Sequence, residues 1–167
     1  VHPDPRRETD MSKLTAQQKA YDDHYLVVDK ARESFDRLLE VNKTVKLIND
    51  QMLHVPDSVK KQIADAGKVL TDSTTQLMEL YMPPAETKGI VRNNNKLNSL
   101  LWRAGSDIGA SQGPPNQMAR FASREAKDRL QTILQRINQF FDTEWKAYRE
   151  KVEAVQYSLF KDYESIK

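Results

Sequence analysis

The sequence predicts an all-α protein, an antiparallel bundle of four helices of which two are long, one medium and one short. Apolar residues recur at steps of three or four along three long stretches, which is the spacing of one helix face. The 167 residues include only five Gly and seven Pro, and these gather at a few breaks. Charged residues make up 30% of the chain and alternate in sign along each stretch, as on solvated helix faces.

The first long helix is expected from about residue 15 to 53, with Ser12 or Thr15 as its N-cap. Such a helix is about 55 Å long and needs partners along its whole length. Its predicted apolar stripe consists of Tyr21, Tyr25, Val28, Ala31, Phe35, Leu38, Val41, Val45, Ile48 and Met52.

The medium helix follows a break at "HVPDSVKK", where Pro56 removes a backbone donor and Asp57 or Ser58 can cap. It ends at "MPPAETKG", because Pro83 and Pro84 cannot continue it. The connection to the first helix is short, so the two are expected to be antiparallel. Its predicted apolar face is Val59, Ile63, Ala66, Leu70, Leu77, Leu80 and Tyr81, with a polar gap at Ser73 and Thr74.

The short helix is expected after a turn at "RNNNK", with Leu97, Leu100, Leu101 and Ala104 on its apolar side. The segment "GSDIGASQGPPN" holds three glycines and two prolines and is predicted to be a loop.

The second long helix begins at Pro114 or Pro115, whose missing N–H costs nothing in a first turn. It is expected either as one rod to about residue 156 or with a kink near Asp142, where Asp142 and Thr143 could start a fresh helix. Its predicted apolar stripe is Met118, Ala122, Ala126, Leu130, Ile133, Ile137, Phe140, Trp145, Tyr148, Val152 and Val155.

No catalytic, cofactor-binding or metal-binding residue is predicted, and no cofactor. A di-metal bundle needs Glu-x-x-His pairs, but Tyr21 precedes His24 by three residues and Gln51 precedes His54. Both histidines are therefore expected at the hydrated surface. The acidic residues lie beside Lys or Arg as surface pairs, and no nucleophile elbow, phosphate loop or zinc-protease motif occurs.

The charge pattern argues against nucleic acid as a partner. Lys and Arg total 26 against 24 Asp and Glu, and the two signs are interleaved instead of forming a basic stripe. No stretch has the 18 or so uncharged apolar residues that a membrane span needs. The chain has no Cys, which excludes disulfides and thiolate chemistry.

The aromatic residues near the C-terminus are favoured as core residues, because aromatic residues at helical spacing are more often core, but they also supply a candidate interaction surface. Phe140 and Phe141 cannot both enter one core, because neighbouring helix residues diverge by about 100°. The Asn-rich turn beside Trp102 resembles sugar-binding chemistry, although Asn is also the residue of turns and caps, which is the favoured interpretation. The candidate interaction residues are Asn94, Trp102, Phe141, Trp145 and Phe160.

The chain resembles the C-terminal helical region of bacterial proteins built on sortilin-like, Asp-box (BNR) repeat β-propellers, commonly labelled glycosyl hydrolases. The resemblance is carried by "HPDPR", by "EVNKTVKLIND", by the Leu97–Asn98–Leu100 helix and by the loop containing Asp107 and Pro114. It implies that residues 1–11 are a linker or the last strand of a preceding domain and that 12–167 form the helical domain.

The resemblance further implies a non-catalytic accessory domain of an exported protein, periplasmic or extracellular, that braces the propellers or mediates protein–protein interaction. The implied partners are upstream propeller domains of the same polypeptide, with self-association as a further possibility. No catalytic residue of the family maps onto this chain. Two alternatives stay open: a glycan- or peptide-binding helical module, and a bundle enzyme that uses metal or carboxylates.

Overall fold

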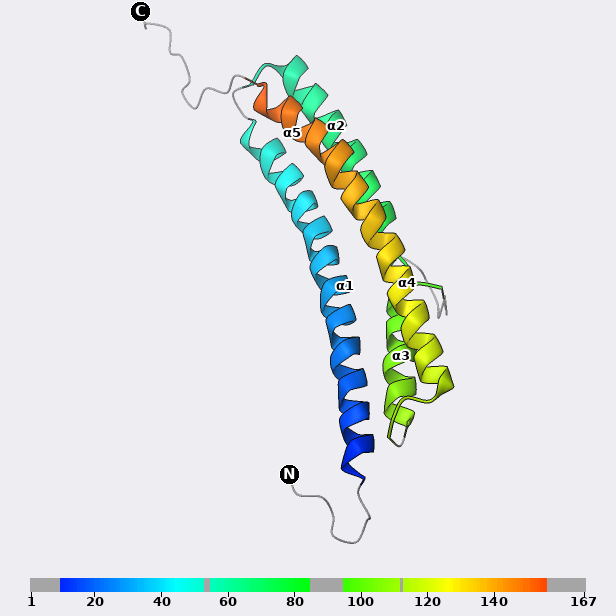
Figure 1. Cartoon of the computed structure of the whole chain (residues 1–167). Coiled ribbons are helices and arrows are strands. Elements are labelled where there is room, and N and C mark those ends of the chain that lie inside the picture. The colour runs from blue at the N-terminus through cyan, green and yellow to red at the C-terminus, as the bar shows by residue number, and fades with distance from the viewer. Residues whose placement is uncertain (1–9, 53–54, 85–94, 112, 156–167) are drawn as a thin grey trace, which may run out of the picture. The chain divides into compact units, whose positions relative to one another are not determined.

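The computed structural model describes residues 10–52, 55–84, 95–111 and 113–155. All regular structure in these residues is helical, so the predicted all-α class is confirmed. The elements are α1 (Met11–Gln51), α2 (Asp57–Met78), α3 (Leu97–Ala110), α4 (Gln117–Phe140), the π-helical turn η1 (Phe141–Trp145) and α5 (Lys146–Glu153) (Figure 1). Because α4, η1 and α5 follow without a break, the described chain forms two long helical rods, one medium helix and one short helix.

The chain divides into two compact units. Unit 1 consists of residues 1–35 and 79–134, and unit 2 of residues 36–78 and 135–167. Unit 1 contains the first part of α1, α3 and most of α4. Unit 2 contains the rest of α1, α2, the end of α4, η1 and α5.

In unit 1, α3 runs antiparallel to α1. Gln17, near the start of α1, donates from its side-chain amide to the carbonyls of Ile108 and Ser111 at the end of α3. Ser34, farther along α1, contacts Tyr81, which lies next to the start of α3 because the N–H of Asn98 donates to the Tyr81 carbonyl at 3.0 Å.

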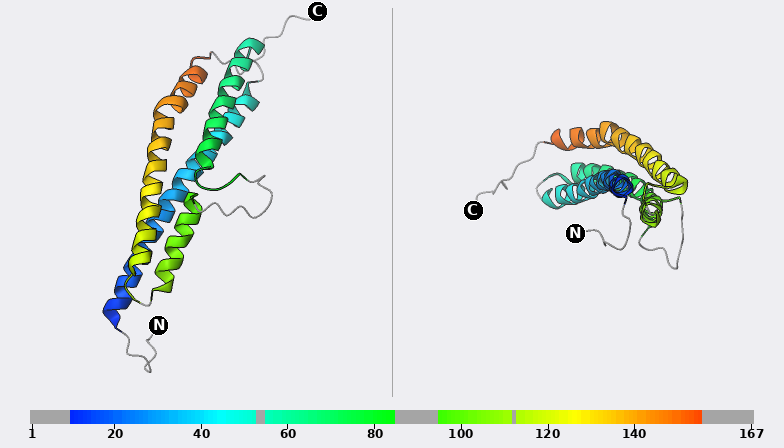
Figure 2. Two further views of the ribbon diagram at one scale, coloured as in Figure 1. Left: turned by 90° about the vertical axis from the view of Figure 1, so that its right-hand side faces the viewer. Right: turned by 60° about the horizontal axis from the view of Figure 1, so that its bottom comes forward.

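The helix α4 in turn runs antiparallel to α3. Arg103 forms a salt bridge with Glu125, and the hydroxyl of Ser111, just after α3, accepts from the N–H of Asn116, just before α4. Since α1 and α4 both run opposite to α3, they run parallel to each other within unit 1 (Figure 2).

Two glycines that the sequence analysis placed in a loop belong to α3, which continues to Ala110. A Cβ on Gly105 would lie 3.0 Å from Nε2 of His24, and a Cβ on Gly109 would lie 2.8 Å from the hydroxyl oxygen of Tyr21. The four-residue spacing places both glycines on the face that meets α1. The missing side chains therefore make room for His24 and Tyr21, and the predicted loop begins only at Ser111.

The start of α3 is capped by backbone carbonyls. Its N-cap residue, Lys96, makes no side-chain cap. The N–H groups of Leu97 and Asn98 donate instead to the carbonyls of Leu80 and Tyr81, at 3.1 and 3.0 Å. This pairing satisfies two of the donors that a helix N-terminus leaves open. Asn94 lies outside the described residues.

Other helix starts also differ from prediction. Asp10 caps α1, accepting from the N–H of Ser12 at 3.0 Å, where Ser12 or Thr15 was expected as the cap. Asn116 caps α4, accepting from the N–H of Ala119 at 2.9 Å, and the two prolines precede the helix. A short polar side chain caps each helix, but the prediction chose a later polar residue for α1 and placed a proline in the first turn of α4.

Two members of the predicted apolar stripes face solvent. Tyr25 and Met118 are exposed, and the neighbouring residues His24 and Ala119 take the inward positions. The other described residues of the predicted stripes are buried or half-buried. The described buried apolar residues are Ala31, Leu38, Val41, Val45, Met52, Val55, Ile63, Leu70, Tyr81, Leu97, Leu100, Leu101, Ala104, Ile108, Ala119, Ala122, Ala126, Leu130, Ile133, Ile137, Phe140 and Tyr148.

In unit 2, α2 runs antiparallel to α1 and packs against α5. Near the end of α2, the Thr74 hydroxyl donates to Oδ1 of Asn42 at 2.6 Å. About two turns earlier in α2, Gly67 faces Val45 of α1 and Tyr148 of α5. Thr74 is fully buried, so the predicted polar gap in α2 is a buried hydrogen-bonded contact.

The second long rod is continuous at the place where a kink was an alternative. The π turn Phe141–Trp145 inserts there, and the Thr143 hydroxyl donates to the Gln139 carbonyl at 2.8 Å. Phe140 is buried while Phe141 is only half-buried, and the two rings meet edge to face at 5.3 Å. The predicted divergence of these neighbours is therefore confirmed.

Tyr148→Phe is expected to leave the protein as stable as the parent or up to about 1 kcal/mol more stable. The Tyr148 hydroxyl is buried and has no hydrogen-bond partner among the described residues, and this burial raises its pKa. Tyr81→Phe is the matched control, because the buried Tyr81 hydroxyl lies 2.7 Å from the Ser34 hydroxyl, and its loss should cost about 1 kcal/mol. Urea unfolding measures both; a larger loss in Tyr148→Phe would contradict this account.

Candidate interaction groove

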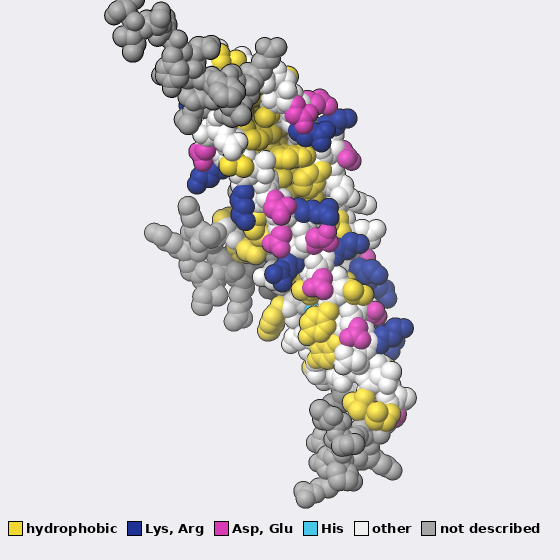
Figure 3. All heavy atoms as spheres, turned by 90° about the vertical axis from the view of Figure 1, so that its left-hand side faces the viewer, with side chains coloured by type: hydrophobic (Ala, Val, Ile, Leu, Met, Phe, Trp, Pro, Cys, Tyr) yellow, Lys and Arg dark blue, Asp and Glu magenta, His cyan; other side chains and the backbone are white. Residues whose placement is uncertain are grey.

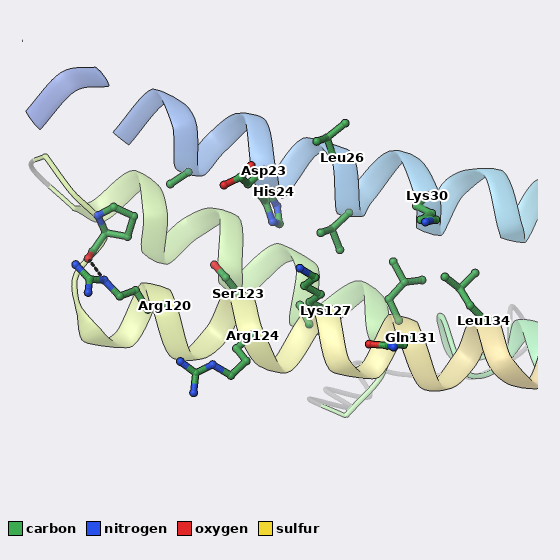
Figure 4. Close-up of a pocket in the computed structure, with 15 residues that line it drawn as sticks. Asp23, His24, Leu26, Lys30, Arg120, Ser123, Arg124, Lys127, Gln131 and Leu134 are labelled. Atoms are coloured by element: carbon green, nitrogen blue, oxygen red, sulfur yellow. Dashed lines mark hydrogen bonds between the residues drawn. The ribbon is translucent and has the colours of Figure 1, made fainter. Parts of the chain in front are cut away.

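A groove of about 870 Å³ lies between α1 and α4 in unit 1 (Figure 4). Residues of α1 form one wall and residues of α4 the other, because the two helices run side by side here. The lining residues are Ala20, Asp23, His24, Leu26, Val27, Lys30, Pro115, Arg120, Ser123, Arg124, Ala126, Lys127, Leu130, Gln131 and Leu134.

Small and apolar side chains leave the groove open. Ala20 and Ala126 are too short to fill the space between the helices, and Val27 and Leu130 add apolar surface. Leu26 is 67% exposed, although a large apolar side chain at a helix surface gains free energy when it is covered. The groove therefore offers apolar area to an occupant.

The charged side chains of the groove are mostly basic. Its cations are Lys30 on α1 and Arg120, Arg124 and Lys127 on α4, against one carboxylate, Asp23. Arg120 is held at one end, where its Nε donates to the Pro115 carbonyl at 2.9 Å. In Figure 4, Lys127 extends from α4 toward α1 and His24 from α1 toward α4.

His24 is half-buried, so its prediction as a hydrated surface residue is wrong. Its ring occupies the space that Gly105 of α3 leaves free. Burial lowers the pKa of His24 below its usual value of 6.5, because desolvation penalises the charged imidazolium. His24 lies seven residues before Ala31 and fourteen before Leu38, and this spacing could have shown that it shares their face.

The depressed pKa of His24 predicts that unit 1 loses stability on acidification. The unfolded chain takes up a proton near pH 6.5, whereas the folded chain takes it up only at lower pH, so folding is favoured above this window and weakened as pH falls through it. The neighbouring charges, which are Asp23, Lys30, Arg120, Arg124 and Lys127, are mostly positive and add no compensating partner beyond Asp23. Melting temperatures from pH 7.5 to 5 should fall more steeply in the parent than in His24→Gln; equal slopes would contradict the prediction.

The predicted interaction residues belong to different parts of the chain. Trp102 belongs to unit 1 and is 75% exposed on α3, whereas Phe141 and Trp145 belong to unit 2 and are half-buried. Trp145 lies against Tyr148 with ring centroids 6.2 Å apart. Asn94 and Phe160 lie outside the described residues.

None of the residues that line the groove was predicted from the sequence as part of an interaction surface. Leu26 stands off the predicted stripe, and Lys30 and Lys127 read as ordinary surface charges. A detectable signal was the series Ala119, Ala122 and Ala126, whose small side chains on one face of a long helix indicate a close approach or a space beside it.

Neither a metal cluster nor a membrane-spanning helix is found in the part of the chain that the structure covers. Within it, no three His, Cys, Asp or Glu side chains come together as a metal site would require. None of the described helices combines the length and the apolar character needed to cross a bilayer. On the face drawn in Figure 3, basic and acidic side chains alternate with hydrophobic ones.

Comparison with known proteins gives no relative. No family model matches the chain, no curated protein is similar to it, and no solved structure resembles its fold at a significant level.

Proposed function

We propose that the chain is a non-catalytic helical accessory module that acts by binding protein surfaces through unit 1. The observation that carries the proposal is the uneven distribution of exposed apolar side chains. Eight of the ten large hydrophobic residues that are exposed among the described residues belong to unit 1. They are Met11, Leu14, Tyr25, Leu26, Met82, Trp102, Met118 and Phe121.

The exposed apolar residues of unit 1 include two pairs, and the members of each pair are close to each other on one helix. Met118 and Phe121 lie three residues apart and so share one face of α4, while Tyr25 and Leu26 are adjacent on α1. Isolated exposed apolar residues are common, but their concentration in one unit is typical of an interaction surface. Burial of that area would drive the function, without any bond being made or broken.

A more specific proposal concerns the partners of the module. They are the propeller domains of an exported BNR-repeat protein, and the module braces these domains. This proposal is supported by the sequence resemblance alone. The coding sequence that precedes Val1 in its gene tests it directly, since Asp-box repeats there are expected and their absence would remove the parentage. The encoded propeller fragment, titrated with this chain by calorimetry, should then form a complex; no heat of binding and no co-elution would count against the proposed function.

A glycan- or peptide-binding module is the second candidate, and the exposure of Trp102 favours it. An indole on a helix surface can stack on a sugar ring or pack on a peptide. A glycan array probed with the parent and with Trp102→Ala distinguishes the two functions. Glycan binding by the parent that is lost in Trp102→Ala would favour the glycan- or peptide-binding module over the accessory module.

A further inference from the structure

We propose that the groove between α1 and α4 in unit 1 binds an acidic amphipathic helix from a protein partner. This inference rests on the proposed function and adds to it the site and the chemistry of the partner. Three properties of the groove support it: its shape, the character of its floor and the sign of its charge.

The shape of the groove fits a helix. On α1 the lining residues recur at Ala20, Asp23, Val27 and Lys30, and on α4 they recur at the same spacing from residue 120 to 134. Both walls therefore follow the helical period, and the groove runs along the helix axes for about 15 Å of α1 and about 21 Å of α4. An occupant of about 11–14 residues in helical form would match that length.

The packing of unit 1 also has room for a fourth helix. Within the unit, α1 and α4 are parallel, and α3 packs antiparallel to both. A helix laid in the α1–α4 groove would complete four helices around one core, which is a common stable arrangement. The short side chains of Ala20, Ser123 and Ala126 allow the close approach that such packing requires.

The lining selects an amphipathic occupant with acidic flanks. Leu26, Val27 and Leu134 offer apolar contacts along the groove, and the buried Leu130 lies beneath them. The charged residues around them comprise four Lys and Arg side chains and one Asp. A helix with an apolar stripe bordered by Glu and Asp would cover the first set and face the second, as in other helix-in-groove complexes.

A membrane surface fits the groove less well. An interfacial helix presents a convex apolar face to lipid, whereas the apolar residues here line a hollow between two helices. Binding to anionic lipid is therefore treated as an outcome that the experiment can report.

The test is selection from a displayed library of 14-residue amphipathic helices whose polar positions vary among Glu, Gln and Lys. The parent chain, Lys30→Glu/Lys127→Glu and the control Lys68→Glu/Lys146→Glu serve as separate targets. All four lysines are exposed, and the control pair lies in unit 2, so both variants should fold as the parent does by circular dichroism.

We expect enriched helices that carry net negative charge and bind the groove variant at least tenfold more weakly than the parent at low salt. The control variant should bind as the parent does, and the tenfold difference should shrink at high salt, because exposed charges are screened. Vesicles of phosphatidylglycerol and phosphatidylcholine are tested by sedimentation with the same three proteins.

Three results would overturn the inference. In the first, the selection enriches neutral or basic helices, or enriches no helix. In the second, the enriched helices bind the parent and the groove variant with equal affinity. In the third, no helix is enriched, and the parent binds vesicles while the groove variant does not. Calorimetry with the propeller fragment distinguishes failure of the inference from failure of the proposed function. A complex that forms equally well with the groove variant leaves the proposed function standing and removes only the groove.

Discussion

Leu130→Ala is expected to destabilise the protein by about 2–5 kcal/mol. Leu130 is 3% exposed, and it lies on the inward face of α4 in unit 1, where it also contributes to the floor of the groove. The substitution removes three buried carbon atoms, so the free energy gained by burying them is lost. It also leaves a cavity that the surrounding helices cannot fill by moving together. The effect should appear as a lower urea midpoint with an unchanged slope.

Met118→Ala is the matched control on the same helix. Met118 is 66% exposed, so its truncation should change stability by no more than about 0.5 kcal/mol. Unfolding of Leu130→Ala at the parent's midpoint would mean that this face of α4 is not packed as described. Phe35→Ala should fall between the two, because Phe35 is half-buried but packs edge-on against Tyr81 at 5.3 Å.

The predictable part of the fold is the part set by helical periodicity. Leu38, Val41, Ile133 and Ile137 are buried as their spacing requires, because a long amphipathic helix has only one way to hide such a stripe. Although α2 ends at Met78, before the prolines that were expected to end it, the helix break near Pro56 was likewise predictable, since proline removes a donor. These features depend on local chemistry, which a single sequence contains.

The features that were missed depend on contacts between helices distant in sequence. Gly105 and Gly109 look like loop formers until α1 lies against them, and His24 looks like a surface residue until Gly105 makes room for its ring. The interior position of Thr74 depends on Asn42, 32 residues earlier. No local pattern specifies such pairings.

The groove could not be predicted from the sequence for the same reason. Its walls come from residues about 100 apart in the chain, and its opening results from which side chains are short where two helices meet. Lys30 and Lys127 carry no signal of their own. Only their placement on opposite walls of one hollow makes them a candidate recognition pair.

Gly67→Leu is expected to destabilise unit 2 by up to about 2 kcal/mol, since overpacking costs about 1–3 kcal/mol and the better helix propensity of Leu returns about 0.8 kcal/mol. A Cβ at Gly67 would lie only 2.8 Å from Cγ1 of Val45, and the rest of a leucine would meet Tyr148, whose hydroxyl oxygen lies 3.5 Å from that Cβ position. Val45 is short and β-branched, so it cannot turn aside without leaving its preferred rotamer.

Gly105→Ala separates the steric effect at Gly67 from the general effect of replacing a helical glycine. Its new Cβ would meet the far end of the His24 side chain, at 3.0 Å from Nε2, and that ring can tilt toward the open groove. The gain in helix propensity should then dominate, so Gly105→Ala is expected to be neutral or up to about 1 kcal/mol more stable. Urea unfolding followed by circular dichroism compares the two variants. A Gly67→Leu protein as stable as Gly105→Ala would show that α1, α2 and α5 do not pack closely around residue 67, and the described core of unit 2 would then have to be revised.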